Sequence, residues 1–247
     1  MSSSAVPYSH DKPVPEALTE EGIMAFVDDF RLAAVNAIAA GFDGVEIHAA
    51  NGYLIDQFQQ DTCNQRTDGW GGDTAKRARF GLAVVKVVVD AIGGSRTGIR
   101  LSPHSEFQGV RMQDFESQFT YFVKGLVELK LAYLHLVESR MSGNADVEPC
   151  GELDFLIELW GKTNPVFLAG GYTPALAKEA VDKEYSAFQV AIVFGRHFTS
   201  NPDLPFRVKN GIDLAPWDRS TLQKVMSPHG YTDFPFSDEF ASGLLRI

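Results

Sequence analysis

One short segment of the sequence carries three side chains that could act together on a carbonyl compound. His48, Asn51 and Tyr53 lie at spacings of three and two residues, directly after an apolar run. A histidine and an asparagine can donate two hydrogen bonds to one electron-poor oxygen. A tyrosine, whose reference pKa is about 10, is protonated at neutral pH and can supply a proton. The spacing alone occurs often by chance, so its interpretation depends on the surrounding elements.

Strand alternation predicts further polar groups beside this segment. Successive strand residues face opposite sides, so Glu46 and His48 share one face, and Arg100 and His135 lie on the corresponding face of later strands. Buried charges are costly unless they are paired or bound to a ligand. The pattern therefore fits an ion-pair network inside a barrel, or a polar site at the carboxyl ends of parallel strands, where barrel enzymes place their chemistry.

Two glycine-bearing segments follow the last two predicted strands. Barrel enzymes often bind phosphate through the loops after their last two strands. Glycine lets backbone N–H groups approach a ligand closely, and arginine can hold a phosphate through two hydrogen bonds. The residues predicted to bind a phosphate group in this way are Gly170, Gly171, Gly195 and Arg196.

The spacing of apolar residues predicts an α/β fold with parallel strands. Thr19 is the predicted N-cap of a first helix that Gly41 ends. The predicted strands are 43–48, 97–101, 132–137, 166–169 and 189–194, and the later helices are 74–91, 114–129, 153–160 and 174–182. Strands that alternate with helices indicate β/α units. The count is five strands, three fewer than a (β/α)₈ barrel contains.

Length and composition are those of one globular domain. The chain has 247 residues, of which 45% are hydrophobic and 22% charged, which excludes a mainly disordered protein. We expect a single domain over 1–247, with a loop at 1–20, β/α units at 21–200 and a C-terminal extension at 201–247.

Charge and cysteine content limit the partners and the compartment. The net charge of −10 disfavours nucleic acid and anionic membranes as partners. Cys63 and Cys150 form neither a disulfide framework nor a metal-ligand pattern, so we expect no metal. The sequence shows no signal peptide and no apolar stretch long enough to span a membrane, which favours a cytoplasmic location.

A dense series of motifs resembles the Old Yellow Enzyme family, in particular its fungal branch, which includes reductases of secondary metabolism. The motifs keep the family's order and cover nearly the whole chain. They are Gly41-Phe42-Asp43-Gly44-Val45-Glu46-Ile47-His48, Asn51-Gly52-Tyr53-Leu54-Ile55-Asp56-Gln57-Phe58, Asn64 with Arg66-Thr67-Asp68, Trp70-Gly71-Gly72, Arg77-Ala78-Arg79-Phe80, Gly98-Ile99-Arg100-Leu101-Ser102-Pro103, His135-Leu136-Val137-Glu138, Ala169-Gly170-Gly171, Gly195-Arg196, Ser200-Asn201-Pro202-Asp203-Leu204 and Gly230-Tyr231.

The resemblance implies a (β/α)₈ barrel that holds FMN. In that family NAD(P)H reduces the flavin, and the flavin passes a hydride to the β-carbon of an activated alkene. The resemblance implies that His48 and Asn51 hydrogen-bond the substrate's carbonyl oxygen and that Tyr53 protonates the α-carbon. Arg100 would lie at the flavin ring and favour negative charge on its reduced form. The FMN phosphate would lie against Gly170, Gly171, Gly195 and Arg196.

The chain also departs from the family pattern. Its five predicted strands resemble strands four to eight, so the first three βα units, with their FMN contacts, are absent. Leu222-Gln223 replaces an aromatic pair that includes a substrate-pocket tyrosine, and Ser139 replaces a proline. A five-stranded arc leaves two exposed edges. A second copy, a partner chain or the chain's own N-terminus would cover them, or the chain is an unstable fragment.

These observations lead to one main hypothesis and two alternatives. The main hypothesis is an FMN-dependent ene-reductase that uses NAD(P)H to reduce the activated C=C bond of an α,β-unsaturated carbonyl compound. Some ergot-pathway relatives have phenylalanine in place of this tyrosine, which turns the reductase toward isomerisation, so Tyr53 favours reduction. The first alternative is a flavin-free homologue that catalyses a non-redox step, such as isomerisation or cyclisation, or only binds a ligand. The second is another FMN barrel, such as a dihydroorotate-oxidising type, which the His-x-x-Asn-x-Tyr arrangement disfavours.

Overall fold

The structure, a computed structural model, describes residues 1–142, 145–148, 151–162, 164–222 and 224–244. It comprises two compact units. The first contains Met1–Gly171 and Glu179–Ile192, and the second contains Tyr172–Lys178 and Val193–Ile247. The organisation of 1–247 as a single domain stays a prediction.

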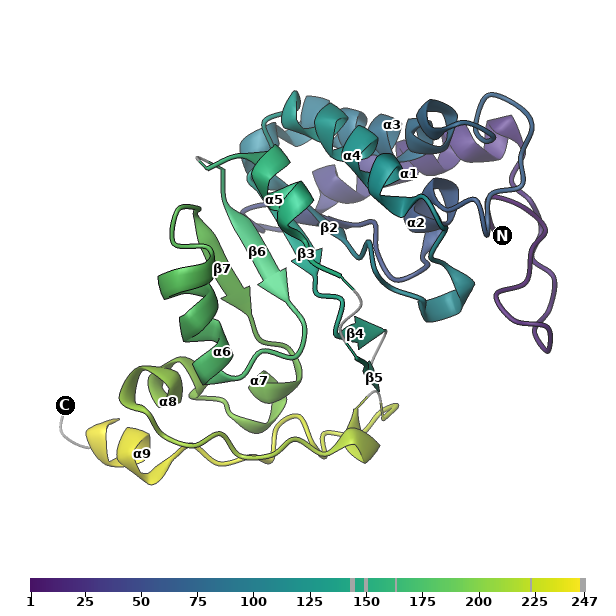
Figure 1. The fold of residues 1–247 in the computed structure, drawn as a ribbon. Helices are drawn as coiled ribbons and strands as arrows, with labels where there is room; N and C mark the ends of the chain where they lie inside the picture. Colours follow the sequence, from purple (N-terminus) through teal and green to yellow (C-terminus); the bar gives the residue numbers. More distant parts are fainter. Residues whose placement is uncertain (143–144, 149–150, 163, 223, 245–247) are drawn as a thin grey trace. The chain divides into compact units, whose positions relative to one another are not determined.

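A five-stranded sheet is the main β structure of the chain (Figure 1). Its strands run in the order β1-β2-β3-β6-β7, and their bounds are Val45–His48, Thr97–Leu101, Tyr133–Val137, Val166–Ala169 and Val190–Val193. β1, β2, β3 and β6 pair in parallel, with His48 beside Arg100 and Arg100 beside His135. A short antiparallel hairpin, β4 (Met141–Ser142) with β5 (Ala145–Asp146), follows β3. Because the main strands are parallel, their carboxyl ends share one edge.

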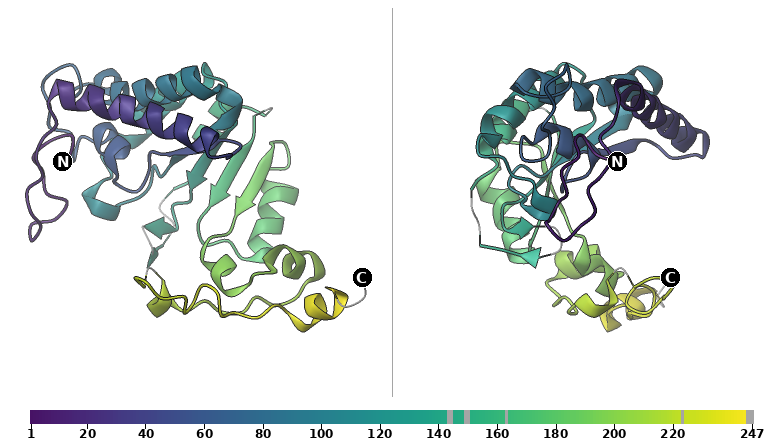
Figure 2. Two further views of the ribbon diagram at one scale, coloured as in Figure 1. Left: turned by 180° about the vertical axis from the view of Figure 1, so that it is seen from behind. Right: turned by 90° about the vertical axis from the view of Figure 1, so that its right-hand side faces the viewer.

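A layer of helices covers one face of this sheet (Figures 1 and 2). It consists of α1 (Glu20–Ala39), α3 (Thr74–Ile92), α4 (Phe115–Val127) and α5 (Asp154–Trp160), each packed against the next. Thr19 accepts a hydrogen bond from Gly22 N–H at 3.1 Å, which confirms it as the cap of α1. The core lies between the two layers, where strand residues such as Ile99 and Leu134 are fully buried.

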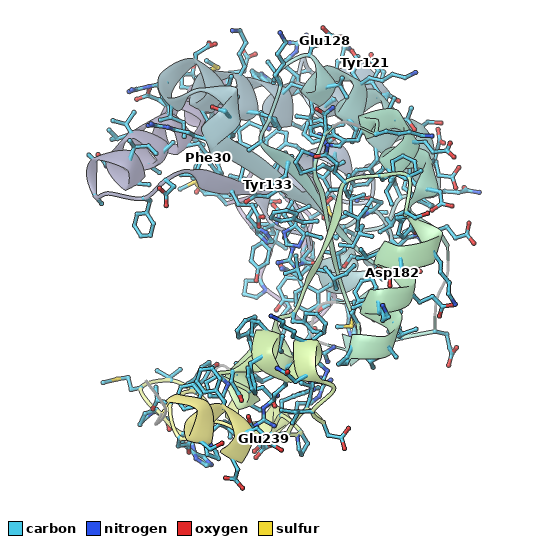
Figure 3. All side chains as sticks on the ribbon, turned by 90° about the vertical axis from the view of Figure 1, so that its left-hand side faces the viewer. Phe30, Tyr121, Glu128, Tyr133, Asp182 and Glu239 are labelled. Atoms are coloured by element: carbon cyan, nitrogen blue, oxygen red, sulfur yellow. The ribbon has the colours of Figure 1, made fainter. Side chains whose placement is uncertain are left out.

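The other face of the sheet carries the polar side chains. In Figure 3, Tyr133 of β3 projects on the opposite side of the sheet from Tyr121 of α4 and from Glu128 at the C-terminal end of α4. His135, two residues further along β3, shares the face of Tyr133, as strand alternation requires. The division into an apolar face toward the helices and a polar face away from them confirms the prediction from the sequence.

The remaining elements of the first unit are short. They are α2 (Leu54–Gln59), the 3₁₀ turns η1 (Gly94–Arg96) and η2 (Phe107–Gly109), and the π-helical turn η3 (Ala180–Glu184). The N-terminal loop is tied to itself by a bridge between Ser2 and Ala17. The sequence did not predict α2, which lies directly after the candidate trio. Six residues are too few to show helical periodicity.

The second unit is built from short helices around a buried carboxylate. Its elements are α7 (Arg196–Ser200), α8 (Leu204–Asn210), η4 (Arg219–Thr221), α9 (Asp238–Leu244) and most of α6 (Pro174–Glu179). Asp203 accepts hydrogen bonds from Arg207 Nε at 2.8 Å and from the backbone N–H of Ser237 at 3.0 Å. This carboxylate therefore joins α8 to the start of α9. No helix in the described part of the chain is long and apolar enough to cross a membrane.

Candidate active site

The segment with His48, Asn51 and Tyr53 forms a tight turn between β1 and α2. Asn51 and Gly52 both have left-handed backbones, with φ of 56° and 70°. A Cβ atom at Gly52 would lie 2.8 Å from the carbonyl oxygen of Phe107, so a larger residue would clash with this backbone. Glycine at this position therefore allows the loop after β2 to pack against the turn.

Side chains bind every backbone polar group of Asn51 and Gly52. The N–H of Asn51 donates to Ser102 Oγ at 2.7 Å, and its carbonyl accepts from Gln108 Nε2 at 3.0 Å. The N–H of Gly52 donates to Asp56 Oδ2 at 2.8 Å, and its carbonyl accepts from Gln57 Nε2 at 2.7 Å. The backbone of the turn is thus fixed from α2 and from the loop after β2.

His48 and Tyr53, at the two ends of this turn, lie close to each other. Their ring centroids lie 5.2 Å apart, with an angle of 54° between the ring planes. Tyr53 is 51% exposed, Asn51 is half-buried and His48 is exposed. None of the three side chains hydrogen-bonds to another residue within the described ranges. Their polar atoms are therefore available to a ligand.

The charge state of His48 suits a hydrogen-bond donor. Loss of hydration on the side of the ring that faces the protein, together with the positive charge of Arg100, lowers the pKa of His48 below its usual value. The imidazole is consequently neutral at neutral pH and carries one N–H. A neutral ring can polarise a carbonyl oxygen through this donor without giving up its proton.

Below the turn, the polar face holds a connected group of side chains. His135 is buried, and its Nδ1 lies 2.8 Å from Glu46 Oε2. Burial alone would raise the pKa of Glu46, but hydrogen bonds from His135 and Tyr133 outweigh it and lower the pKa below its usual value. Burial and the neighbouring Glu46 charge raise the pKa of Tyr133 to about 12, so this phenol stays protonated.

Like His135, whose Nε2 has no partner, Arg100 has incomplete hydrogen bonding within the described residues. It lies between His48 and His135 across the strands, and its Nε is buried without a hydrogen-bond partner in the described residues. Burial lowers its pKa, and Glu46 is the charge that opposes this effect. An orphaned guanidinium donor beside an open polar face suits an electron-rich ligand such as a flavin ring.

The predicted phosphate-binding residues fall in both compact units. Gly170 and Gly171 follow β6 with φ of 121° and 62°. A Cβ at Gly170 would lie 2.9 Å from Met141 Cγ, so packing also requires glycine there. Gly195 has no atom within 4 Å of an added Cβ, and the guanidinium of Arg196 lies 4.6 Å from the Trp217 ring centroid. Their joint use for phosphate stays a prediction.

The structure accounts for one departure and leaves others open. Ser139 is buried, and its hydroxyl donates to the carbonyl of Gly151 at 2.6 Å, a bond that the family's proline cannot make. Gln223 and Cys150 lie outside the described residues, while Cys63 is a free, half-buried thiol. No sequence motif indicated that Ser102, Gln108 and Asp56 hold the turn. Only Asp56 had a local signal, an acidic residue in the first turn of a helix.

A parallel β/α sheet with a polar site at the carboxyl ends of its strands is the arrangement of enzymes built on (β/α)₈ barrels. The chain belongs to the NADH:flavin oxidoreductase / NADH oxidase family, whose family model matches residues 2–215. It is 55% identical over 244 residues to chanoclavine-I aldehyde reductase fgaOx3 of Penicillium roqueforti, a match that covers 99% of this chain and 66% of that protein.

Two further matches agree with this assignment. A protein of Epichloe festucae var. lolii named "Probable inactive reductase easA" is 48% identical over 247 residues, which is 97% of this chain and 65% of that protein. Old Yellow Enzyme from Pichia sp. AKU4542 has a TM-score of 0.86 at 34% identity, covering 96% of this chain and 63% of that structure. The family resemblance and the partial-barrel fold class are thus confirmed. The chain spans less than two thirds of the length of these relatives.

Proposed function

We propose that this chain carries the active-site face of an FMN-dependent ene-reductase that uses NAD(P)H to reduce α,β-unsaturated carbonyl compounds. One observation supports this most directly: His48 and Tyr53 meet at the end of β1, one strand away from the orphaned Arg100. The turn offers donors to a carbonyl oxygen, and the face beneath it offers an unsatisfied cation to a flavin. The family assignment supports the same pairing of functions.

Arg100 would hold the flavin ring, and Gly170, Gly171, Gly195 and Arg196 would hold the FMN phosphate. When bound and reduced by NAD(P)H, FMN supplies the hydride that adds to the β-carbon of the alkene. A guanidinium at the ring favours the anionic reduced form because it places a positive charge where negative charge develops. This role explains why a cation is kept on a half-buried strand position without a full set of partners.

The three side chains of the turn act on the other end of the substrate. The neutral His48 imidazole and the Asn51 amide each donate a hydrogen bond to the carbonyl oxygen, which withdraws electron density from the β-carbon. Tyr53 then delivers its hydroxyl proton to the α-carbon. Because Tyr53 is 51% exposed, its phenolate regains a proton from solvent.

A second candidate function has support of its own. A relative at 48% identity carries the name "Probable inactive reductase easA", and this chain spans 65% of its length. A flavin-free homologue would keep the turn and use it for a non-redox step, such as isomerisation or cyclisation, or only to bind a ligand. The two candidates differ in whether the folded chain retains FMN.

We further propose that a second chain, either another copy or a partner, covers the open edge of the sheet. Within the described residues β1 has a strand neighbour on one side only. Met24 and Leu32 of α1 and Phe42 before β1 are exposed apolar side chains. A parallel strand edge flanked by apolar side chains is a site for strand pairing. A cytoplasmic location also stays a proposal.

Flavin retention tests the main proposal. The purified chain is incubated with FMN and desalted, and the retained flavin is measured by its visible absorbance. We expect retention by the wild type and by Arg96→Gln, a control at an exposed arginine before β2. Arg100→Gln should weaken FMN binding about 10- to 100-fold, the range for a charged hydrogen bond. A colourless wild-type chain would favour the flavin-free candidate instead.

A further inference from the structure

A buried carboxylate in the first turn of α2, that of Asp56, has no part in the proposed chemistry. Asp56 has no exposed surface, and each of its oxygens accepts one hydrogen bond. Oδ2 accepts from the N–H of Gly52 at 2.8 Å, and Oδ1 accepts from Gln60 Nε2 at 3.0 Å. Gly52 lies between Asn51 and Tyr53, so this carboxylate binds the backbone of the turn at its centre.

The two groups that bind Asp56 can act only as hydrogen-bond donors. The Oε1 atom of Gln60 accepts from the backbone N–H groups of Met112 at 2.8 Å and Arg111 at 3.2 Å. The amide of Gln60 therefore turns its NH₂ group toward Asp56. The backbone N–H of Gly52 is also a donor in every state. Only a group that accepts on both oxygens satisfies the two donors, and among side chains of this size that group is the ionised aspartate.

The carboxylate is held there without a cation. No salt bridge to Asp56 exists among the described residues, and the Cys63 thiol is the titratable neighbour whose pKa it influences. Burial raises the pKa of Asp56 to about 6, although the bonds from Gln60 and Gly52 oppose the shift. An unpaired buried charge is costly. The orientation that Asp56 imposes on the turn explains its position better than a contribution to the stability of the fold does.

We propose that Asp56 is a positioning residue, which holds the turn so that Asn51 and Tyr53 face the carbonyl substrate. The proposal rests on the proposed function for its catalytic consequence. That Asp56 holds the backbone of the turn rests on the hydrogen bonds alone. Through Gln60, Asp56 also links the turn to the loop after β2, which supplies Ser102 and Gln108 to the same backbone.

The test compares Asp56→Asn with Asp61→Asn, a control that removes the same charge at an exposed position. Asparagine keeps the size of the side chain but places an NH₂ group against one of the two donors. We expect hydrogen exchange at the Gly52 amide to rise at least about tenfold in Asp56→Asn, since 1.4 kcal/mol of lost hydrogen bonding is a factor of ten. Exchange in β2 and β3 should stay within about twofold, and Asp61→Asn should match the wild type.

A second measurement follows the two half-reactions of the FMN-loaded chain, with 2-cyclohexenone as the probe. Asp56→Asn should slow flavin reoxidation by the enone about 10- to 100-fold and leave flavin reduction by NAD(P)H within twofold, because only the turn is misplaced. If Asp56→Asn does not fold, Gln60→Met, which leaves the carboxylate and removes its fixed partner, is measured in the same way.

Three results would overturn the proposal. One is an unchanged Gly52 amide, and another is an equal rise of exchange throughout the chain, which indicates general destabilisation. The third is an equal loss of both half-reactions. A wild-type chain that never binds FMN refutes the proposed function, but the exchange measurement then still decides whether Asp56 holds the turn.

Discussion

Glu46 and His135 meet at 2.8 Å although β2 lies between their strands. Gly98 makes this possible, because it stands in register between Glu46 and Tyr133 and has no side chain. A Cβ at Gly98 would overlap the ring of Tyr133 at Cζ. Because glycine has no side chain, Glu46 of β1 and His135 of β3 can interact across β2.

Gly98→Ala should therefore destabilise the protein and separate Glu46 from His135. Overpacking a filled site costs about 1–3 kcal/mol, and here the ring of Tyr133 must move as well. Chemical denaturation gives the free energy of unfolding. Gly195→Ala is the matched control for stability, because nothing lies within 4 Å of its added Cβ, and it should change that free energy by less than about 0.5 kcal/mol. Equal stability of Gly98→Ala and the wild type would contradict the packing described here.

Tyr53→Phe should slow alkene reduction by about 10²–10⁴, the usual contribution of a general acid. Flavin reduction by NAD(P)H should be largely spared, because the phenol acts only on the alkene. Stopped-flow absorbance of the flavin measures the two half-reactions separately. Tyr121→Phe, which removes an exposed hydroxyl from α4, should leave both rates unchanged. Parallel losses of both rates in Tyr53→Phe would argue against the assigned role.

Asp203→Ala should release the C-terminal segment that begins at Ser237. Removing one partner of a buried ion pair costs about 3–5 kcal/mol because the other charge stays buried. Circular dichroism during thermal denaturation measures the loss. Asp213→Ala, at an exposed carboxylate, is the control and should unfold like the wild type. A wild-type melting curve for Asp203→Ala would show that the bonds to Arg207 and Ser237 contribute little.

The same carboxylate gives a pH dependence with a definite sign. Burial would raise the pKa of Asp203, but the hydrogen bonds from Ser237 and Arg207 outweigh it and hold the pKa at about 2. Since the folded-state pKa lies below the ordinary value of 3.8, this contribution is present above pH 3.8 and is lost as the pH falls toward 2. Asp203→Ala should lack this component of acid denaturation, and an unchanged acid transition would contradict the prediction.

The sequence predicted the strands that carry the site better than the side chains that hold the turn. The strands at 97–101 and 166–169 were predicted with the bounds that the structure has. The first places Ile99 and Leu101 on either side of Arg100, the second is a short apolar run, and turn residues lie beside both. Alternation also placed Glu46 and His135 on one face. The residues that bind Asn51, however, are Ser102 and Gln108, which lie 51 and 57 positions away. No local pattern indicates such contacts, since they depend on how two loops pack.

The open edge at β1 gives a prediction about mass in solution. If a second copy of the chain covers this edge, light scattering after size-exclusion chromatography should report at least twice the monomer mass of 27.1 kDa. Phe42→Asp, which places a charge beside the edge, should then lower the mass toward the monomer. A wild-type chain that is a stable monomer on its own would contradict the proposal that a second copy covers β1.

The central claim is that the turn after β1 and the face beneath it reduce an activated alkene. Its most direct test is product analysis with the FMN-loaded chain, NAD(P)H and 2-cyclohexenone without oxygen. We predict one cyclohexanone formed for each NAD(P)H oxidised, with product formation reduced about 10²–10⁴-fold in Tyr53→Phe. A chain that retains FMN and oxidises NAD(P)H but forms no cyclohexanone would contradict the account.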